Sequence, residues 1–289
     1  MATLLGGLLL LALAAGASAS ARASDSRSSG ALQATSAAVP LRIACVGDSI
    51  TAGLNAGRGT ASYPAQLQTL LGAHYVVENF GVPEKSVTTC RVPSGATRHE
   101  AYSNTSAYTR ALAYNADVVV IMLGTNDAGC PWEIAEAGFA PNYEAIIDAF
   151  SAAGDAPTIL LATPPPLYQG DYPARLAGAP PGFPAFNQSW INRELPLRTA
   201  QVASSRDALP PPIDVFGRFQ QQCPVVAGTL GHAPSPDLVV CPLMDNGVTN
   251  GPLDCGLHPN SDGYTVIARA VRDAILLALG APVDRHVQM

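Results

Sequence analysis

Apolar and polar positions along the chain follow two alternating periods. Short continuous apolar runs, typical of strands buried on both faces, are followed by segments in which apolar residues recur every three or four positions, as on one face of a helix. The expected strands are 41–46, 75–80, 118–123, 158–162 and 213–216, and the expected helices are 63–71, 99–114, 143–152, 187–204 and 261–279. This alternation predicts an α/β fold with a mostly parallel central sheet covered on both faces.

Proline and glycine gather in two stretches that break this alternation, 164–184 and 217–257. The chain of 289 residues contains 26 glycines and 25 prolines, while its 48% apolar content is that of a globular protein. Long loops in a compact domain are commonly functional or disordered. We expect one loop-rich domain over residues 40–280, followed by a short tail at 281–289.

The N-terminal residues have the features of a secretory leader. The first 21 residues carry no charged side chain, and an apolar Leu/Ala/Gly stretch from Leu4 to Ala15 is followed by small residues. We expect a signal peptide over residues 1–23 and a disordered lead-in over 24–39, with the mature protein secreted or in the lumen of the secretory pathway. An uncut membrane anchor is the alternative, since the leader has only its α-amino group as a positive charge.

Positive charge is scarce, which excludes two classes of partner. The chain has 16 Lys and Arg against 22 Asp and Glu, a net charge of −6, and Lys85 is its single lysine. A basic nucleic-acid platform and a polybasic membrane surface both need clustered cations. We therefore expect no nucleic-acid partner, and no stable membrane partner once the leader is removed.

Six cysteines follow the leader, which in an exported chain permits up to three disulfides. Spacing does not select among the 15 possible pairings. The first choice is Cys223 with Cys241, which would close a Pro/Gly-rich excursion, whereas Cys45 lies in a strand-like run and reads as a buried thiol. Sequons at Asn104 and Asn187 agree with export and glycosylation. No C-x-x-C pair or His-Glu-x-x-His motif occurs, so neither a metal nor another cofactor is expected.

Reactive residue types follow the expected strands at the edge where ligands bind in open α/β sheets. Asp48-Ser49 follows the first strand, Gly81 the second, Asn126-Asp127 the third, and His258 precedes the last helix. Each alone is commonly a turn residue or a helix cap. Together they supply a hydroxyl, a base and hydrogen-bond donors, the set that acyl transfer requires.

The residues suggest the following roles. Ser49 would attack a carbonyl carbon, and His258 would take the serine proton and pass it to the leaving alcohol. The backbone N–H groups of Ser49 and Gly81 and the amide of Asn126 would form an oxyanion hole.

This arrangement resembles the SGNH hydrolases, also called GDSL esterases and lipases, from about Leu41 to Leu279. Gly47-Asp48-Ser49-Ile50, Gly81, Gly124 to Asp127 and His258-Pro259 are similar to its four sequence blocks. The resemblance implies a flavodoxin-like three-layer α/β/α sandwich that hydrolyses carboxylic esters without a metal. Thr163-Pro164-Pro165-Pro166 and the residues after His258 look most like the branch containing carbohydrate acetylesterases.

One position departs from the family pattern. The family places an Asp three residues before the His, but Cys255 stands there and Asp254 lies one step further back. We expect Asp254 to be the acid of the triad, and a Ser–His dyad supported by a backbone carbonyl is the alternative. Cys255 itself is expected to be buried or disulfide-bonded.

The sequence thus predicts a secreted serine esterase that removes short acyl groups, acetyl first, from small or polymeric carbohydrates or related alcohols. Tyr168 and Trp190, in an aromatic segment near the expected site, are candidate substrate contacts, unless they only anchor a loop. Two other functions stay open: a lipase or lysophospholipase acting on longer acyl chains, and a non-catalytic glycan-binding protein with the same fold.

Overall fold

The computed structural model describes residues 39–56, 60–91, 95, 97–168, 186–223, 241–245 and 256–282. The expected leader and lead-in, together with Asp254 and Cys255, lie outside the described residues. Within these ranges, no helix combines the length and the apolar character needed to cross a membrane.

The central sheet consists of four parallel strands, β1 (Leu41–Gly47), β2 (Tyr75–Gly81), β5 (Val118–Met122) and β6 (Thr158–Leu161). Their order across the sheet is β2-β1-β5-β6. In this register the last residue of β1, Gly47, stands opposite Gly81 and Met122. The carboxyl ends of three strands therefore meet at one edge, as the sequence predicted.

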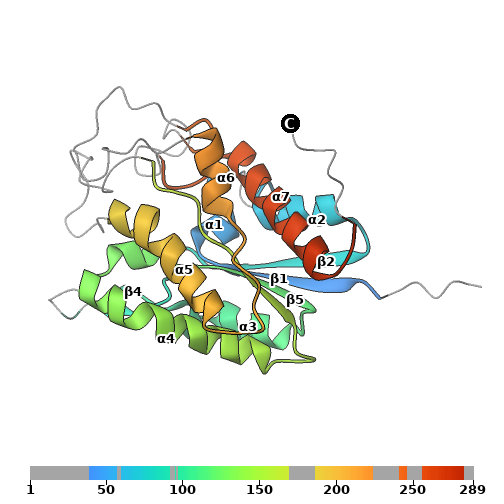
Figure 1. Ribbon diagram of the computed structural model, residues 1–289, viewed down its shortest axis with the longest axis horizontal. Coiled ribbons are helices and arrows are strands. Elements are labelled where there is room, and N and C mark those ends of the chain that lie inside the picture. Colours follow the sequence, from blue (N-terminus) through green and yellow to red (C-terminus); the bar gives the residue numbers. More distant parts are fainter. Residues whose placement is uncertain are drawn as a thin grey trace, which may run out of the picture. The chain divides into compact units, whose positions relative to one another are not determined.

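Helices cover both faces of the sheet (Figure 1). One face carries α2 (Tyr63–Leu71), α6 (Val215–Gln222) and α7 (Ser261–Ala278), and the other carries α3 (Ser106–Ala113), α4 (Trp132–Ser151) and α5 (Leu195–Ser204). The predicted three-layer α/β/α sandwich is confirmed.

Alternate side chains of the inner strands supply two hydrophobic cores, as the period of a strand requires. Ile43 and Cys45 of β1 pack with α2 and α7, whereas Ala44 and Val46 pack with α4 and α5. All residues of β5 are buried, because this strand has helices on both sides. Continuous apolar character was therefore a correct signal for a central strand.

Two expected elements differ from the structure. Residues 99–114 contain the end of β4 (Thr97–His99), a 3₁₀ turn η2 (Tyr102–Asn104), and a helix that begins only at Ser106, because the Thr105 side chain caps it. The strand expected at 213–216 is wrong. Ile213 forms a single bridge to Ala162, and Asp214 caps α6 at that point by accepting from the Gly217 N–H.

Two helices are also longer or less regular than expected. Helix α4 begins at Trp132 and accommodates Pro141 in its interior, while the segment expected at 187–204 opens with a π-helical turn, η4 (Trp190–Glu194), before α5. Proline in a helix interior removes one hydrogen bond, which the other turns of this 20-residue helix tolerate.

Disulfides join Cys90 to Cys130 and Cys223 to Cys241. The second pair confirms the first choice made from the sequence, and Cys45 is a buried free thiol as expected. Cys90 lies in β3 (Cys90–Arg91), which pairs with β4 in a small antiparallel sheet that periodicity did not predict.

Candidate active site

Ser49 lies at the turn between β1 and the short helix α1 (Ser49–Ala52). This turn needs glycine at position 47, because a Cβ there would stand 2.0 Å from Thr51 Oγ1 and 2.5 Å from the Met122 carbonyl oxygen. The Asp48 carboxylate caps α1 by accepting from the Ile50 N–H at 2.9 Å. The Gly-Asp-Ser sequence thus fixes the serine at the first residue of a helix.

His258 faces Ser49 across the sheet edge. Its Nε2 lies 2.9 Å from Ser49 Oγ, and the two residues are 5% and 7% exposed. The segment around His258 is held in place because the Asp245 N–H donates to the His258 carbonyl oxygen at 2.9 Å. A nucleophile and a base in this relation are the first requirement of acyl-transfer catalysis.

Asn126 reaches the same place from the end of β5, where it begins the 3₁₀ helix η3 (Asn126–Gly129). Its Nδ2 donates to the Lys85 carbonyl oxygen at 3.0 Å and makes a longer contact of 3.4 Å with Asp48 Oδ2. The amide is therefore oriented by two different segments of the chain. One of its N–H groups is only weakly engaged, because a bond of 3.4 Å is long.

The Asp48 carboxyl is buried beside this cluster. Burial raises its pKa to about 6, while the hydrogen bond from Ile50 and the positive charge available on His258 act in the opposite direction. Asp48 therefore lies close enough to His258 for the charges of the two side chains to interact.

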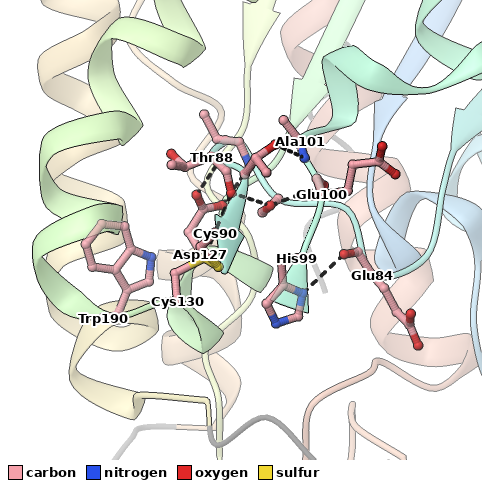
Figure 2. Close-up of a disulfide and its surroundings, with 12 residues drawn as sticks. Glu84, Thr88, Cys90, His99, Glu100, Ala101, Asp127, Cys130 and Trp190 are labelled. Carbon is pink, nitrogen blue, oxygen red and sulfur yellow. Dashed lines mark hydrogen bonds between the residues drawn. A yellow bond between two sulfur atoms is a disulfide. The ribbon is translucent and has the colours of Figure 1, made fainter. Parts of the chain in front are cut away.

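Asp127 is a positioning residue that the sequence reading assigned no role of its own. Its two carboxylate oxygens accept from the N–H groups of Val87 at 2.8 Å and Thr88 at 3.0 Å, and burial raises its pKa to about 7. The disulfide between Cys90 and Cys130 joins the same two segments (Figure 2). Asp127 therefore fastens the loop that contains Lys85 to η3. The sequence feature that could have indicated this role is the position of Asp127 directly after Asn126.

Gly81 lies at the expected strand end, but its N–H group is already hydrogen-bonded there. Its N–H donates to Asn79 Oδ1 at 2.9 Å, and the Asn79 amide in turn donates to the Thr51 carbonyl oxygen at 2.9 Å. A Cβ at position 81 would stand 2.2 Å from the backbone nitrogen of Ala52. Close packing against α1 is therefore sufficient to explain this glycine.

The two aromatic candidates lie in different cores. Trp190 is 1% exposed, and its Nε1 donates to the Gly124 carbonyl oxygen at 3.2 Å, so the structure places it beneath the loop before Asn126 and not at the site surface. Tyr168 is 9% exposed, and its N–H donates to the carbonyl oxygen of Gly256, two residues before His258. Tyr168 is thus the one of the two that adjoins the histidine segment.

Asp254 lies outside the described residues, so its role as the acid stays a prediction. Among the residues that the structure does describe, no three His, Cys, Asp or Glu side chains gather in a way that could hold a metal ion.

Comparison with known proteins agrees with this geometry. Residues 45–266 match the model of the GDSL-like lipase/acylhydrolase family. An acetylxylan esterase from Xylanibacter ruminicola is 35% identical over 246 residues, which cover 81% of this chain and 43% of the relative. The chain therefore spans less than half the length of that protein.

Solved structures show the same fold at low sequence identity. A carbohydrate acetylesterase family member from Sinorhizobium meliloti superposes with a TM-score of 0.52 at 21% identity, over 83% of this chain and 99% of that one. A further carbohydrate acetylesterase structure from the same organism gives a TM-score of 0.50 at 17% identity, over 82% of this chain and 99% of that one. The resemblance recognised in the sequence is confirmed. The chain belongs to the GDSL-like lipase/acylhydrolase family.

Proposed function

We propose that this protein is a secreted serine esterase that removes short acyl groups, acetyl first, from carbohydrates or related alcohols. The observation that carries the proposal is the distance of 2.9 Å between Ser49 Oγ and His258 Nε2, two residues that 209 sequence positions separate. A buried serine hydroxyl that meets an imidazole at hydrogen-bond distance is the arrangement an acyl-transfer nucleophile needs.

The reaction would proceed through an acyl-enzyme. Ser49 Oγ forms a bond to the ester carbonyl carbon while its proton passes to His258 Nε2. The carbon–oxygen bond to the alcohol then breaks, and His258 returns the proton to the departing oxygen. Water repeats the sequence on the acyl-serine, which releases the carboxylic acid and restores both side chains.

The developing oxyanion would be stabilised by the Ser49 backbone N–H and by the N–H of Asn126 that is only weakly engaged with Asp48. Gly81, the third donor expected from the sequence, could contribute only after its N–H leaves Asn79 Oδ1. We therefore assign the larger share of this role to Ser49 and Asn126.

Asp254 is proposed as the acid that orients His258. The buried Asp48 carboxylate lies in the same cluster and interacts electrostatically with His258. Asp48 caps α1, however, and cannot by itself orient the imidazole ring.

The similarity to an acetylxylan esterase over 81% of the chain supports an acetylated sugar as the substrate. The absence of clustered cations in the sequence agrees with a substrate that is not a polyanion. A series of p-nitrophenyl esters from acetyl to dodecanoyl separates this proposal from a lipase, because kcat/KM should fall as the acyl chain lengthens.

Export is part of the proposal. Two disulfides support it, since such bonds persist in oxidising compartments. The leader expected at residues 1–23 would direct that export, and mass spectrometry of the mature N-terminus tests it.

Replacing the nucleophile tests the function most directly. Ser49→Ala should abolish turnover of p-nitrophenyl acetate, while Ser103→Ala, which removes an exposed hydroxyl, should leave turnover at the wild-type level. A fluorophosphonate probe should label the wild-type protein and not Ser49→Ala, because only an activated serine reacts. Absence of both turnover and labelling in the folded wild-type protein would favour the non-catalytic glycan-binding alternative.

A further inference from the structure

A cavity of about 300 Å³ has part of its wall in η3, the 3₁₀ helix that begins with Asn126. Ala128 and Gly129 form part of its wall, and they follow Asn126 by two and three residues in the same 3₁₀ helix. Because such a helix rises about 2 Å per residue, this wall begins roughly 4–6 Å from Asn126 along the helix axis. A subsite at this separation from Asn126 would take a sugar unit attached to the one that reacts at Ser49.

Arg98 lines this cavity and has no acidic partner among the described residues. Its Nε is buried and makes no hydrogen bond. Burial lowers the pKa of its guanidinium, as expected where a cation is partly removed from water without compensation. Lys85, on the neighbouring segment, is different because Glu100 neutralises it at 2.8 Å. The cavity thus contains a cation that has no counter-charge within the described part of the chain.

The residue that follows Arg98 in β4 is buried and packs closely against η3. His99, the next residue of β4, is 4% exposed and contacts the Glu84 carbonyl oxygen through Nδ1 at 3.3 Å (Figure 2). Burial and the nearby Arg98 charge lower the pKa of His99, which favours its neutral form. A Cβ at Gly129 would lie 2.4 Å from His99 Nε2, so the two segments are in close contact.

The remaining walls are suited to a sugar ring. Phe186, whose ring lies 5.9 Å from that of His99, and Pro131 supply apolar surface, and Asn187 supplies a polar rim. Small-ligand sites combine such apolar walls with few polar groups, and a volume of 300 Å³ is at the lower end of their range.

We propose that this cavity is a subsite for a carboxylate, which Arg98 would bind on a uronic acid next to the acylated sugar. The inference rests on the proposed function for its substrate and adds an acidic sugar to it. A guanidinium also offers two parallel N–H donors on its two Nη atoms, and these match the two oxygens of a carboxylate. A neutral hydroxyl would leave the Arg98 charge uncompensated, so the subsite discriminates by charge more than by shape.

The test compares three acetylated xylo-oligosaccharides that differ at one branch: a glucuronic acid, its neutral methyl ester, and no branch. The wild-type protein should hydrolyse the acidic compound with a kcat/KM about tenfold above the other two, which corresponds to about 1.4 kcal/mol. Arg98→Gln should lose this preference and keep wild-type turnover of p-nitrophenyl acetate. Arg269→Gln, on α7 at the opposite face of the sheet, removes the same charge and should keep the preference.

A binding measurement separates the subsite from the esterase activity. Glucuronate should raise the melting temperature of wild-type protein and of Ser49→Ala, and glucuronamide should not, whereas Arg98→Gln should respond to neither compound. Equal rates for the three substrates together with no response to glucuronate would overturn the proposal. A general loss of p-nitrophenyl acetate turnover in Arg98→Gln would also overturn it, by showing a structural role. Glucuronate binding in a protein that hydrolyses no ester would support the subsite and refute the proposed function.

Discussion

The imidazole Nε2 of His258 lies 2.9 Å from the hydroxyl oxygen of Ser49, and both side chains are buried at the carboxyl edge of the sheet. This relation joins the turn after the first strand to the segment before the last helix. It depends on the two cores that seat β1 between α7 and the helices of the other face. The two groups are therefore positioned by the whole sandwich and not by a local motif.

Asp254→Asn tests the acid whose register departs from the family pattern. If Asp254 orients His258, kcat for p-nitrophenyl acetate should fall by up to about 10⁴-fold, because the imidazole would adopt the wrong tautomer. Asp262→Asn, an exposed acid in the first turn of α7, is the matched control and should retain activity. Near-normal turnover in Asp254→Asn would instead favour a Ser–His dyad.

Asn126→Ala tests the oxyanion hole. Removing one preorganised donor should lower kcat by about 10²- to 10³-fold with little change in KM, because the donor acts on charge that develops in the transition state. Asn104→Ala, which removes an exposed amide, serves as the control. A change confined to KM would mean that Asn126 binds the substrate without stabilising the oxyanion.

The residues that start or end elements could be predicted from the sequence, whereas those fixed by tertiary contacts could not. Ser49 and Asn126 follow from one rule, that parallel strands end at a common edge, and His258 was singled out by its place before the last helix. The hydrogen bonds from Val87 and Thr88 to Asp127 join residues about 40 positions apart, and such contacts produce no periodic pattern in the sequence.

Gly81 shows a second limit of sequence reasoning. The sequence suggested that glycine there gives a substrate room to approach, yet the backbone of α1 occupies the space that a Cβ would need. Both readings require glycine, so composition alone cannot separate them. The lack of an acidic partner for Arg98 could not be predicted from the sequence either, because it depends on which segments pack beside that residue.

Asp127→Ala should destabilise the fold and displace the loop that contains Lys85. Two buried N–H groups would lose their acceptors, at a cost of about 2–4 kcal/mol in the free energy of unfolding. Thermal unfolding should then occur roughly 5–15 °C lower, and kcat should fall because Lys85 no longer orients Asn126. Asp127→Asn keeps one acceptor, so its melting temperature and kcat should lie between those of wild type and Asp127→Ala. Asp155→Ala, at an exposed position, should change neither the melting temperature nor kcat.

The disulfide between Cys90 and Cys130 should stabilise the same junction. Its 40-residue separation corresponds to about 4 kcal/mol of unfolded-state entropy, against about 3 kcal/mol for the 18-residue separation of Cys223 and Cys241. The Cys90→Ser/Cys130→Ser double variant should therefore unfold at lower denaturant concentration and also lose activity. The Cys223→Ser/Cys241→Ser variant gives the comparison, and equal effects on kcat would argue against a specific role for the first bond.

His99 should make stability depend on pH between about 7 and 5. Its folded pKa is lowered, mainly by burial, so the unfolded chain takes up a proton near the ordinary value of about 6.5 while the folded protein does not. The unfolded state then binds more protons, and the contribution of His99 to stability is lost as the pH falls below 6.5. Asp48 and Asp127 also titrate in this range with raised pKa values, of about 6 and about 7, and their effect on stability has the opposite sign.

The informative quantity for His99 is therefore the difference in unfolding free energy between wild type and His99→Asn, in which the carboxyl effects cancel. The stability advantage of wild type over His99→Asn should shrink as the pH is lowered from 7 to 5, measured by urea unfolding at each pH. A constant difference across that range would show that His99 does not titrate differently in the folded and unfolded states.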